Sequence, residues 1–195
     1  MNILIIDTNF EKDSIFQLEY INPVIKIIKE NSNKNTIKIL HFSKLKTNID
    51  EQIKQLKEYE KIIISGNSLQ DFKFLENIDK FQFIKYTNKD ILGICAGSQI
   101  IGKIFNLEII KKTKIGIEKN IKIENNNNNN NIINQANINE IYSLHNYYTN
   151  PDNQFETILK TTIPIFIKHK EKNIYATTFH PEIKNEQIII NFINL

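Results

Sequence analysis

The sequence predicts an α/β fold, with a mostly parallel central sheet and helices on both of its faces. Apolar runs typical of buried strands occur at residues 2–7, 36–42, 61–65 and 90–94. Helical patterns separate these runs, and strands that alternate with helices pair in parallel through helical crossovers. Groups that follow such strands should gather at the carboxyl edge of the sheet, where open α/β sheets bind ligands. In this sequence the groups that follow strands are Asp7-Thr8, Gly66-Asn67 and Cys95.

Apolar residues three or four positions apart predict the helices between these strands. Residues 14–31 carry such a stripe, and Pro23 is expected to kink the helix because proline lacks a backbone N–H. Residues 49–59 and 71–86 are the next two predicted helices. In the second of these, the side chains expected to face the sheet are Leu75, Ile78, Phe81, Phe83 and Ile84.

The second half of the chain has short apolar segments in place of long alternating elements. Partly antiparallel strands are predicted at residues 107–113, 115–123, 155–161, 164–170 and 173–179, before a final helix at 185–195. They form a small antiparallel addition to the sheet. The run Asn125–Asn131 cannot build a core and is predicted to be a solvent loop. No linker or repeat divides the chain, so residues 1–195 are expected to form a single domain.

Charge and composition restrict the classes of function. The net charge of +3 is too small to indicate nucleic acid, and the sequence has no basic stripe with interleaved aromatics. All 25 basic residues are lysine, so anions would be bound by lysine or by backbone N–H groups. His41 and His169 show no metal-ligand spacing and are expected to lie in the core or on the surface. We therefore predict no metal and no cofactor.

The single cysteine and the lack of long apolar runs predict where the protein works. One cysteine cannot form an internal disulfide and fits a reducing compartment. No stretch approaches the roughly 18–20 apolar residues of a membrane span. The apolar run within residues 2–7 is too short for a signal peptide. These features predict a cytoplasmic protein without a membrane partner.

Cys95 lies where a nucleophile is expected. It follows the strand at 90–94, precedes a helical pattern, and has Gly93 and Gly97 two positions away on either side. This is the spacing of a nucleophile elbow, a sharp strand-to-helix turn in which glycines let the backbones crowd together. The elbow sets the side chain at a helix N-terminus, which favours the thiolate. On the elbow alone, a cysteine that only packs in the core stays an alternative.

A base for this thiol follows the strand at 173–179. His180 can take the thiol proton, and Glu182 can hold the imidazole in the required tautomer. Pro181 fixes the local backbone and places both side chains on a stiff corner. A single histidine before proline can also be a strand end without a task. Its occurrence together with Cys95, each at a strand's carboxyl end, favours catalysis.

The segments Gly93–Gln99 and His180–Glu182 together resemble the signature of the class I (triad) glutamine amidotransferases. The resemblance implies a flavodoxin-like three-layer sandwich. It also implies hydrolysis of L-glutamine to glutamate and ammonia by a catalytic triad of Cys95, His180 and Glu182. The order and spacing of the motifs cover nearly the whole chain.

Two further segments resemble parts of the same family. Ser65–Ser68 is similar to its oxyanion loop, usually Ser-Gly-Gly-Pro, and Tyr142–Asn146 is similar to a segment that holds the glutamine. Asn67 and Ser68 stand where the family usually has Gly-Pro. The oxyanion donor can be kept despite this change, because it is a backbone N–H and not a side chain. The resemblance thus implies glutamine-binding or oxyanion roles for a set of residues: Gly66, Asn67, Ala96, Gln99, Ser143, Leu144 and His145.

By size and motif, the chain resembles most the stand-alone glutaminase subunits such as that of guanylate (GMP) synthase, which pass ammonia to a separate synthase partner. Anthranilate-type and imidazole-glycerol-phosphate-type subunits match less well, and pyridoxal-synthesis glutaminases usually lack a glutamine at the position of Gln99. Two alternatives stay open: a stand-alone γ-glutamyl hydrolase or peptidase of the same fold, and a non-catalytic regulatory member.

Overall fold

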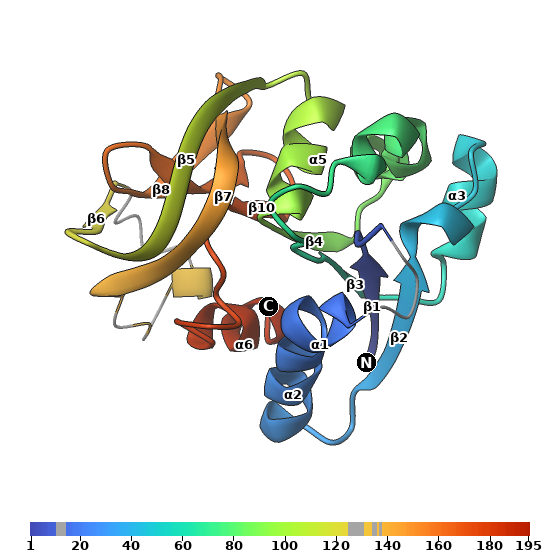
Figure 1. Cartoon of the computed structure of the whole chain (residues 1–195). Helices are drawn as coiled ribbons and strands as arrows, with labels where there is room; N and C mark the ends of the chain where they lie inside the picture. Colours follow the sequence, from blue (N-terminus) through green and yellow to red (C-terminus); the bar gives the residue numbers. More distant parts are fainter. Residues whose placement is uncertain (11–14, 125–130, 134–135, 137) are drawn as a thin grey trace.

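The computed structural model describes residues 1–10, 15–124, 131–133, 136 and 138–195. Within this part of the chain, an eight-stranded sheet runs through the molecule in the order β2-β1-β3-β4-β10-β9-β8-β6 (Figure 1). In this order, the bounds of its strands are Thr36–His41, Asn2–Asp7, Lys61–Ile64, Asp90–Ile94, Ile174–Thr177, Pro164–His169, Phe155–Lys160 and Lys122–Ile123. The first five strands pair in parallel and the last three are antiparallel. The order of the parallel strands is that of a flavodoxin-like sheet, which confirms the predicted fold class.

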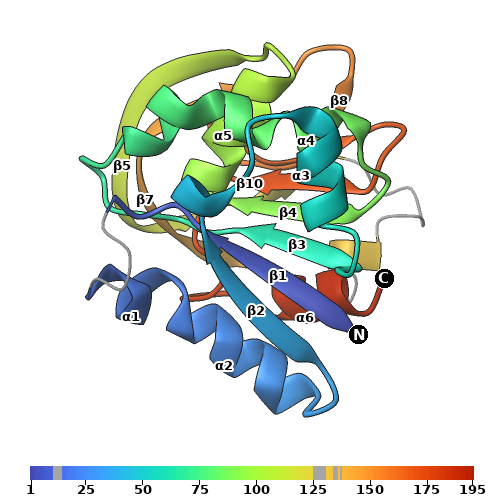
Figure 2. The same ribbon diagram turned by 90° about the vertical axis from the view of Figure 1, so that its right-hand side faces the viewer.

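Helices cover both faces of this sheet and bury a separate apolar cluster on each (Figure 2). Successive side chains of a strand point to opposite faces. In β1, for example, Ile3 and Ile5 belong to one cluster, whereas Leu4 and Ile6 belong to the other. The result is a sheet buried between two helical layers, as predicted.

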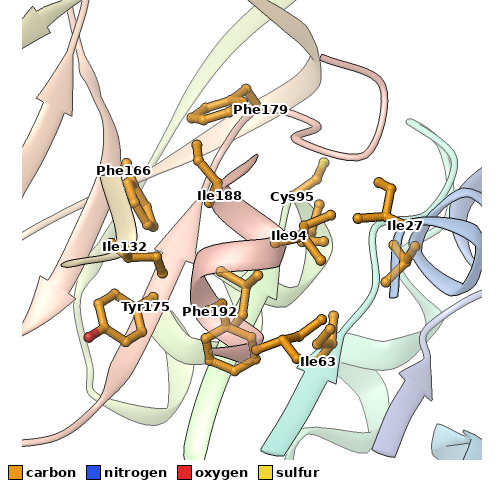
Figure 3. Close-up of a cluster of buried hydrophobic side chains, with 14 of the residues drawn as sticks. Ile27, Ile63, Ile94, Cys95, Ile132, Phe166, Tyr175, Phe179, Ile188 and Phe192 are labelled. Atoms are coloured by element: carbon orange, nitrogen blue, oxygen red, sulfur yellow. The ribbon is translucent and has the colours of Figure 1, made fainter. Parts of the chain in front are cut away.

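The first cluster lies under α2 (Asn22–Asn31) and α6 (Gln187–Ile193). The sheet contributes Ile63 and Ile94 to it, and α6 contributes Ile188 and Phe192 (Figure 3). The second cluster lies under the helical elements α3 (Ile49–Gln55), η2 (Lys73–Phe81), α4 (Phe83–Tyr86) and α5 (Ala96–Ile104). Both clusters reach the nucleophile turn, because Cys95 packs in the first and Ala96 in the second.

Two predicted helices are each divided in the structure. The helix expected at 14–31 is α1 (Phe16–Tyr20) followed by α2, with the break at Ile21 and Pro23 in the first turn of α2. Proline is accepted there because the first N–H groups of a helix lack intrahelical partners. The prediction of one helix over 71–86 was wrong. η2 is a 3₁₀ helix with a non-helical residue at Asn77, and α4 is a separate turn.

After α5 the chain forms a two-stranded antiparallel ribbon of β5 (Glu108–Lys119) and β7 (Glu140–Asn150), which leaves the main sheet (Figure 1). Two strands were expected over 107–123, whereas β5 is one strand with an irregularity between Lys111 and Lys114, and β6 is separate. No strand was expected over β7, so this element is a correction. Residues 125–130 of the asparagine run lie outside the described residues. In the described part of the chain, no helix is long and apolar enough to cross a membrane.

Candidate active site

Cys95 occupies a strained turn between β4 and α5. Its backbone has φ 48° and ψ −95°, a conformation that L-residues rarely adopt, and Ala96 begins the helix directly after it. The turn needs the flanking glycines. A Cβ on Gly93 would lie 2.6 Å from the backbone of Gly97, and one on Gly97 would lie 2.4 Å from the carbonyl oxygen of Ile64. The turn at Cys95 therefore has the predicted geometry of a nucleophile elbow.

His180 and Glu182 form a buried hydrogen-bonded pair next to this turn. His180 Nδ1 lies 2.7 Å from Glu182 Oε1, and the two side chains are 1% and 0% exposed. β10 pairs in parallel with β4, and the backbone N–H of Cys95 donates to the carbonyl of Thr177. This pairing brings the turn after β10 beside the turn after β4. His180 and Cys95 thus meet although 85 positions separate them in the sequence.

The charges around His180 favour its imidazolium form. Burial alone disfavours the charged ring, but the negative charge of Glu182 and the interaction with Cys95 outweigh this effect. Together they raise the pKa of His180 well above its ordinary value. The ring nitrogen Nε2 is buried and makes no hydrogen bond of ordinary geometry to the residues that the structure describes. It is therefore available for a proton transfer.

The loop after β3 passes close to both Cys95 and His180. A Cβ on Gly66 would lie 2.7 Å from His180 Cε1 and 3.5 Å from Cys95 Cβ. Asn67 has a negative φ, so the loop does not need the left-handed conformation that asparagine would have tolerated. Its buried side-chain amide donates to the carbonyls of Thr8 (3.3 Å) and Asp71 (3.0 Å). The departure from the usual Gly-Pro thus adds hydrogen bonds to this loop.

β7 lies against the other side of Cys95. The thiol donates to the carbonyl oxygen of Leu144 at 3.4 Å, and the backbone N–H of His180 donates to the carbonyl of Tyr142. Ser143 is fully buried, and its hydroxyl donates to Glu118 of β5 at 2.6 Å. Gln99 is buried on α5, one turn after the cysteine. All the residues expected to bind glutamine or the oxyanion therefore come from the loop after β3, α5 and β7.

His145 is buried as a neutral imidazole. Burial lowers its pKa to about 4, which the negative charge of Glu118 opposes and the positive charge of His180 reinforces. Neither ring nitrogen makes a hydrogen bond of ordinary geometry to another described residue. Buried polar atoms usually have partners, so an unpaired buried imidazole beside the site is consistent with the predicted contact to substrate.

A cavity of about 450 Å³ lies beside His180. Its wall is largely apolar and aromatic, with lining residues Leu18, Glu19, Tyr20, Pro23, Tyr142, Leu144, His180 and Ile183. The Tyr20 and Tyr142 rings flank His180, with ring centroids 5.8 Å and 6.4 Å away. Leu18 and Ile183 are more than half exposed at the rim.

The other histidines have structural contacts, as expected. His41 Nε2 lies 2.7 Å from the carbonyl oxygen of Asn9, and His169 packs against the rings of Phe105 and Phe155. Among the described residues, no group of three His, Cys, Asp or Glu side chains could hold a metal ion.

Sequence reasoning missed Glu118 near the site and placed Thr8 at the expected sheet edge without assigning it a role. Glu118 binds Ser143, but it lies on an exposed lysine-rich strand that shows no motif. Thr8 contacts the loop after β3, and its only signal was its place at the end of the first strand.

Comparisons with known proteins identify the family of this chain and several of its relatives. The family model described as "Glutamine amidotransferase class-I" matches residues 19–193. The chain is 31% identical over 162 residues to a subunit of the glutamine-hydrolyzing GMP synthase of Pyrococcus abyssi, covering 74% of this chain and 79% of that protein. It is 26% identical over 174 residues to the imidazole glycerol phosphate synthase subunit HisH 2 of Campylobacter jejuni, covering 74% and 84%.

Solved structures show the same fold. A crystal structure described as a GMP synthase subunit from Thermoplasma acidophilum superposes with a TM-score of 0.80 at 21% identity, over 100% of this chain and 92% of that one. A glutamine amidotransferase from Thermotoga maritima superposes with a TM-score of 0.68 at 16% identity, over 99% and 80%. Because the family model spans most of the sequence, the chain belongs to the class-I glutamine amidotransferases, which are cysteine-dependent enzymes.

Proposed function

We propose that this chain is a glutaminase subunit that hydrolyses L-glutamine with Cys95, His180 and Glu182 and delivers ammonia to a separate synthase. The observation that carries the proposal is the buried His180–Glu182 pair, whose free Nε2 lies beside the cysteine of a nucleophile elbow. A nucleophile, a base and a group that orients the base are the parts that nucleophilic amide hydrolysis needs.

In the first half of the reaction, the Cys95 thiolate attacks the side-chain carbonyl carbon of glutamine. The oxyanion that forms is held by the backbone N–H groups of Asn67 and Ala96. His180 then gives its Nε2 proton to the amide nitrogen, the C–N bond breaks, and ammonia leaves. A γ-glutamyl thioester on Cys95 and a neutral His180 remain.

In the second half, His180 takes a proton from water, and the hydroxide attacks the thioester carbonyl. Collapse of this second oxyanion breaks the C–S bond, which releases glutamate and regenerates the thiolate beside the imidazolium. Glu182 stabilises the imidazolium in both half-reactions. Gln99, Ser143, Leu144 and His145 are proposed to hold the glutamine in place.

The resting contacts support a low activity of the isolated chain. A thiolate cannot donate a hydrogen bond, so the bond from Cys95 to the Leu144 carbonyl exists only for the neutral thiol. Activation therefore requires that the Cys95 proton pass to His180, which breaks the bond to Leu144. A partner that shifts β7 would favour this change, and binding-coupled completion of a site is a common way to control reactivity.

The synthase partner is proposed from the relatives. Both relatives described above are named as subunits, and that of the GMP synthase matches at 31% identity. We therefore propose a GMP synthase as the partner. Leu18 and Ile183 at the rim of the cavity are exposed apolar side chains that a partner would cover. We place the pair in the cytoplasm, where a lone thiol stays reduced.

The test is glutamate release by the purified chain, alone and with a GMP synthase partner and its substrates. We expect slow release alone and at least about tenfold stimulation by the partner, with Cys95→Ser as the inactive control. An unstimulated rate on the order of 10 per second would refute the coupling. No glutamate release in either state would refute the proposed function.

A stand-alone γ-glutamyl hydrolase is the second candidate, and the cavity beside His180 favours it. Ammonia needs little room, whereas a cavity of about 450 Å³ could receive the rest of a larger γ-glutamyl conjugate. A γ-glutamyl anilide discriminates between the two functions. A hydrolase would cleave it at least as well as glutamine without a partner, whereas a glutaminase would prefer glutamine.

A further inference from the structure

Thr8 contacts the loop that carries the proposed oxyanion donor. It is fully buried directly after β1, next to β3 in the sheet. Its hydroxyl lies 3.1 Å from the carbonyl oxygen of Ser65, 3.2 Å from that of Gly66 and 3.3 Å from the Ser65 hydroxyl. Its backbone N–H donates to the Ser65 hydroxyl at 3.2 Å. The single hydroxyl proton of Thr8 is thus shared between the Ser65 and Gly66 carbonyls, which belong to the two peptide groups that precede Asn67.

The bond to Gly66 determines the direction of the next N–H. The carbonyl of Gly66 and the N–H of Asn67 belong to one peptide group, which is trans. In a trans peptide these two groups point in opposite directions. The carbonyl points to Thr8 on the β1 side, so the N–H of Asn67 points to the β4 side of β3, where Cys95 lies.

The side chain of Asn67 also joins the loop after β3 to the end of β1. Its Nδ2 donates to the carbonyl of Thr8 at 3.3 Å and to that of Asp71 at 3.0 Å. Each residue thus uses its side chain to bind backbone of the other's segment. We call this reciprocal pair of hydrogen bonds the Thr8–Asn67 clasp. Residues 66–71 contain no proline that would stiffen the loop, so hydrogen bonds must do this.

We infer that Thr8 is a positioning residue, which aims the N–H of Asn67 at the oxyanion by holding the Gly66 carbonyl through the clasp. The inference rests on the proposed function, because it assumes acyl transfer to Cys95. Thr8 does not touch the substrate, and its effect is limited to steps in which negative charge develops on a carbonyl oxygen. Steps without such an oxyanion should be insensitive to it.

The test compares two reactions of Cys95 in Thr8→Val, which removes the hydroxyl at nearly constant volume, and in Thr8→Ser, which keeps it. Acylation by 4-nitrophenyl acetate forms a carbonyl oxyanion, whereas alkylation by iodoacetamide does not. Thr8→Val should lower the ratio of the acylation rate to the alkylation rate by about tenfold or more. It should lower kcat for glutamine similarly, with KM changed less than about threefold. Thr8→Ser should restore both values.

A matched control separates this effect from loss of buried hydrogen bonds in general. Thr149 is also a buried threonine, and its hydroxyl donates to the Ser98 carbonyl at 3.1 Å. Thr149→Val should lower the melting temperature but leave the rate ratio unchanged. If Thr8→Val does not fold, Asn67→Ala opens the clasp from the other side and should lower the same ratio.

An unchanged ratio in whichever of these two variants folds would overturn the inference. An equal loss of acylation and alkylation would do the same, because it would indicate a general structural role. Since neither probe is glutamine, the ratio also tests the clasp if the wild-type chain proves not to hydrolyse glutamine. That result would contradict the proposed function alone.

Discussion

Replacing Gly66 by alanine should disturb the position of the loop after β3 relative to the His180 ring. The new Cβ would lie 2.7 Å from His180 Cε1 and 3.3 Å from Nδ1, whereas ordinary contact begins at 3.4 Å. Relief of the clash requires a movement of about 0.7 Å by the ring or by the loop. The ring cannot yield easily, because it is buried and its Nδ1 is bonded to Glu182 at 2.7 Å. A misplacement of about 1 Å can cost about 100-fold in rate, so we expect kcat to fall by roughly 10- to 100-fold.

The assay is steady-state glutamate release at pH 7, normalised to the folded fraction from thermal unfolding. We expect overpacking to cost about 1–3 kcal/mol of unfolding free energy. Gly102→Ala is the matched control, because its Cβ would lie 2.8 Å from Thr149 Cγ2, at the other end of α5 from Cys95. It should lose similar stability and keep its activity. If Gly66→Ala turned over within about threefold of the parent, the role of this contact in placing His180 would be refuted.

Three further outcomes follow from the site. Cys95→Ser should lower glutamine turnover by at least about 1,000-fold with an unchanged melting temperature, and residual turnover within about tenfold of the parent would contradict the nucleophile assignment. His180→Ala should lower glutamine turnover nearly as much as Cys95→Ser, and Glu182→Gln should lower it less. Since Glu182 raises the pKa of His180, Glu182→Gln should also shift an ionisation in the pH profile of kcat/KM to lower pH. A Glu182→Gln variant less active than His180→Ala, yet folded, would contradict these roles. In the unfolded chain His145 binds a proton near pH 6.5, whereas in the folded protein its pKa is about 4. As the pH falls from 6.5 to 4, the unfolding free energy of the parent should therefore decrease by up to about 3 kcal/mol relative to that of His145→Gln. Unfolding free energies from denaturant titrations that change equally with pH in the two proteins would exclude a buried neutral His145.

The parallel strands could be predicted because their sequences repeat a strong signal. β1, β3 and β4 are buried on both faces, so apolar residues fill them nearly without interruption. β7 lacks such a signal. Its buried positions alternate correctly, but two of them are Ser143 and His145, so the apolar period of a strand is absent. The chemistry expected of this segment is thus the reason that its secondary structure was missed.

In the site too, some features could be predicted from sequence patterns and others could not. Cys95 and His180-Pro181-Glu182 could be found because they are contiguous motifs with a known chemical logic. The thiol contact to Leu144 and the Thr8 contact to Gly66 join segments about 50 to 60 positions apart through backbone carbonyls. Any residue has such a carbonyl, so no side-chain pattern marks these contacts. They depend on the order of the strands, which short-range sequence patterns do not specify.

The position of β10 has a consequence for how the protein is made. β10 (Ile174–Thr177) lies between β4 and β9 in the sheet, yet 79 residues (95–173) separate it from β4 in the chain. During synthesis, β4 therefore keeps an unpaired edge until these 79 residues and β10 itself have left the ribosome. Such an edge favours intermolecular pairing, so a chain that stops before β10 should aggregate. Since β10 also brings His180 to Cys95, the proposed catalytic pair can form only after β10 is inserted.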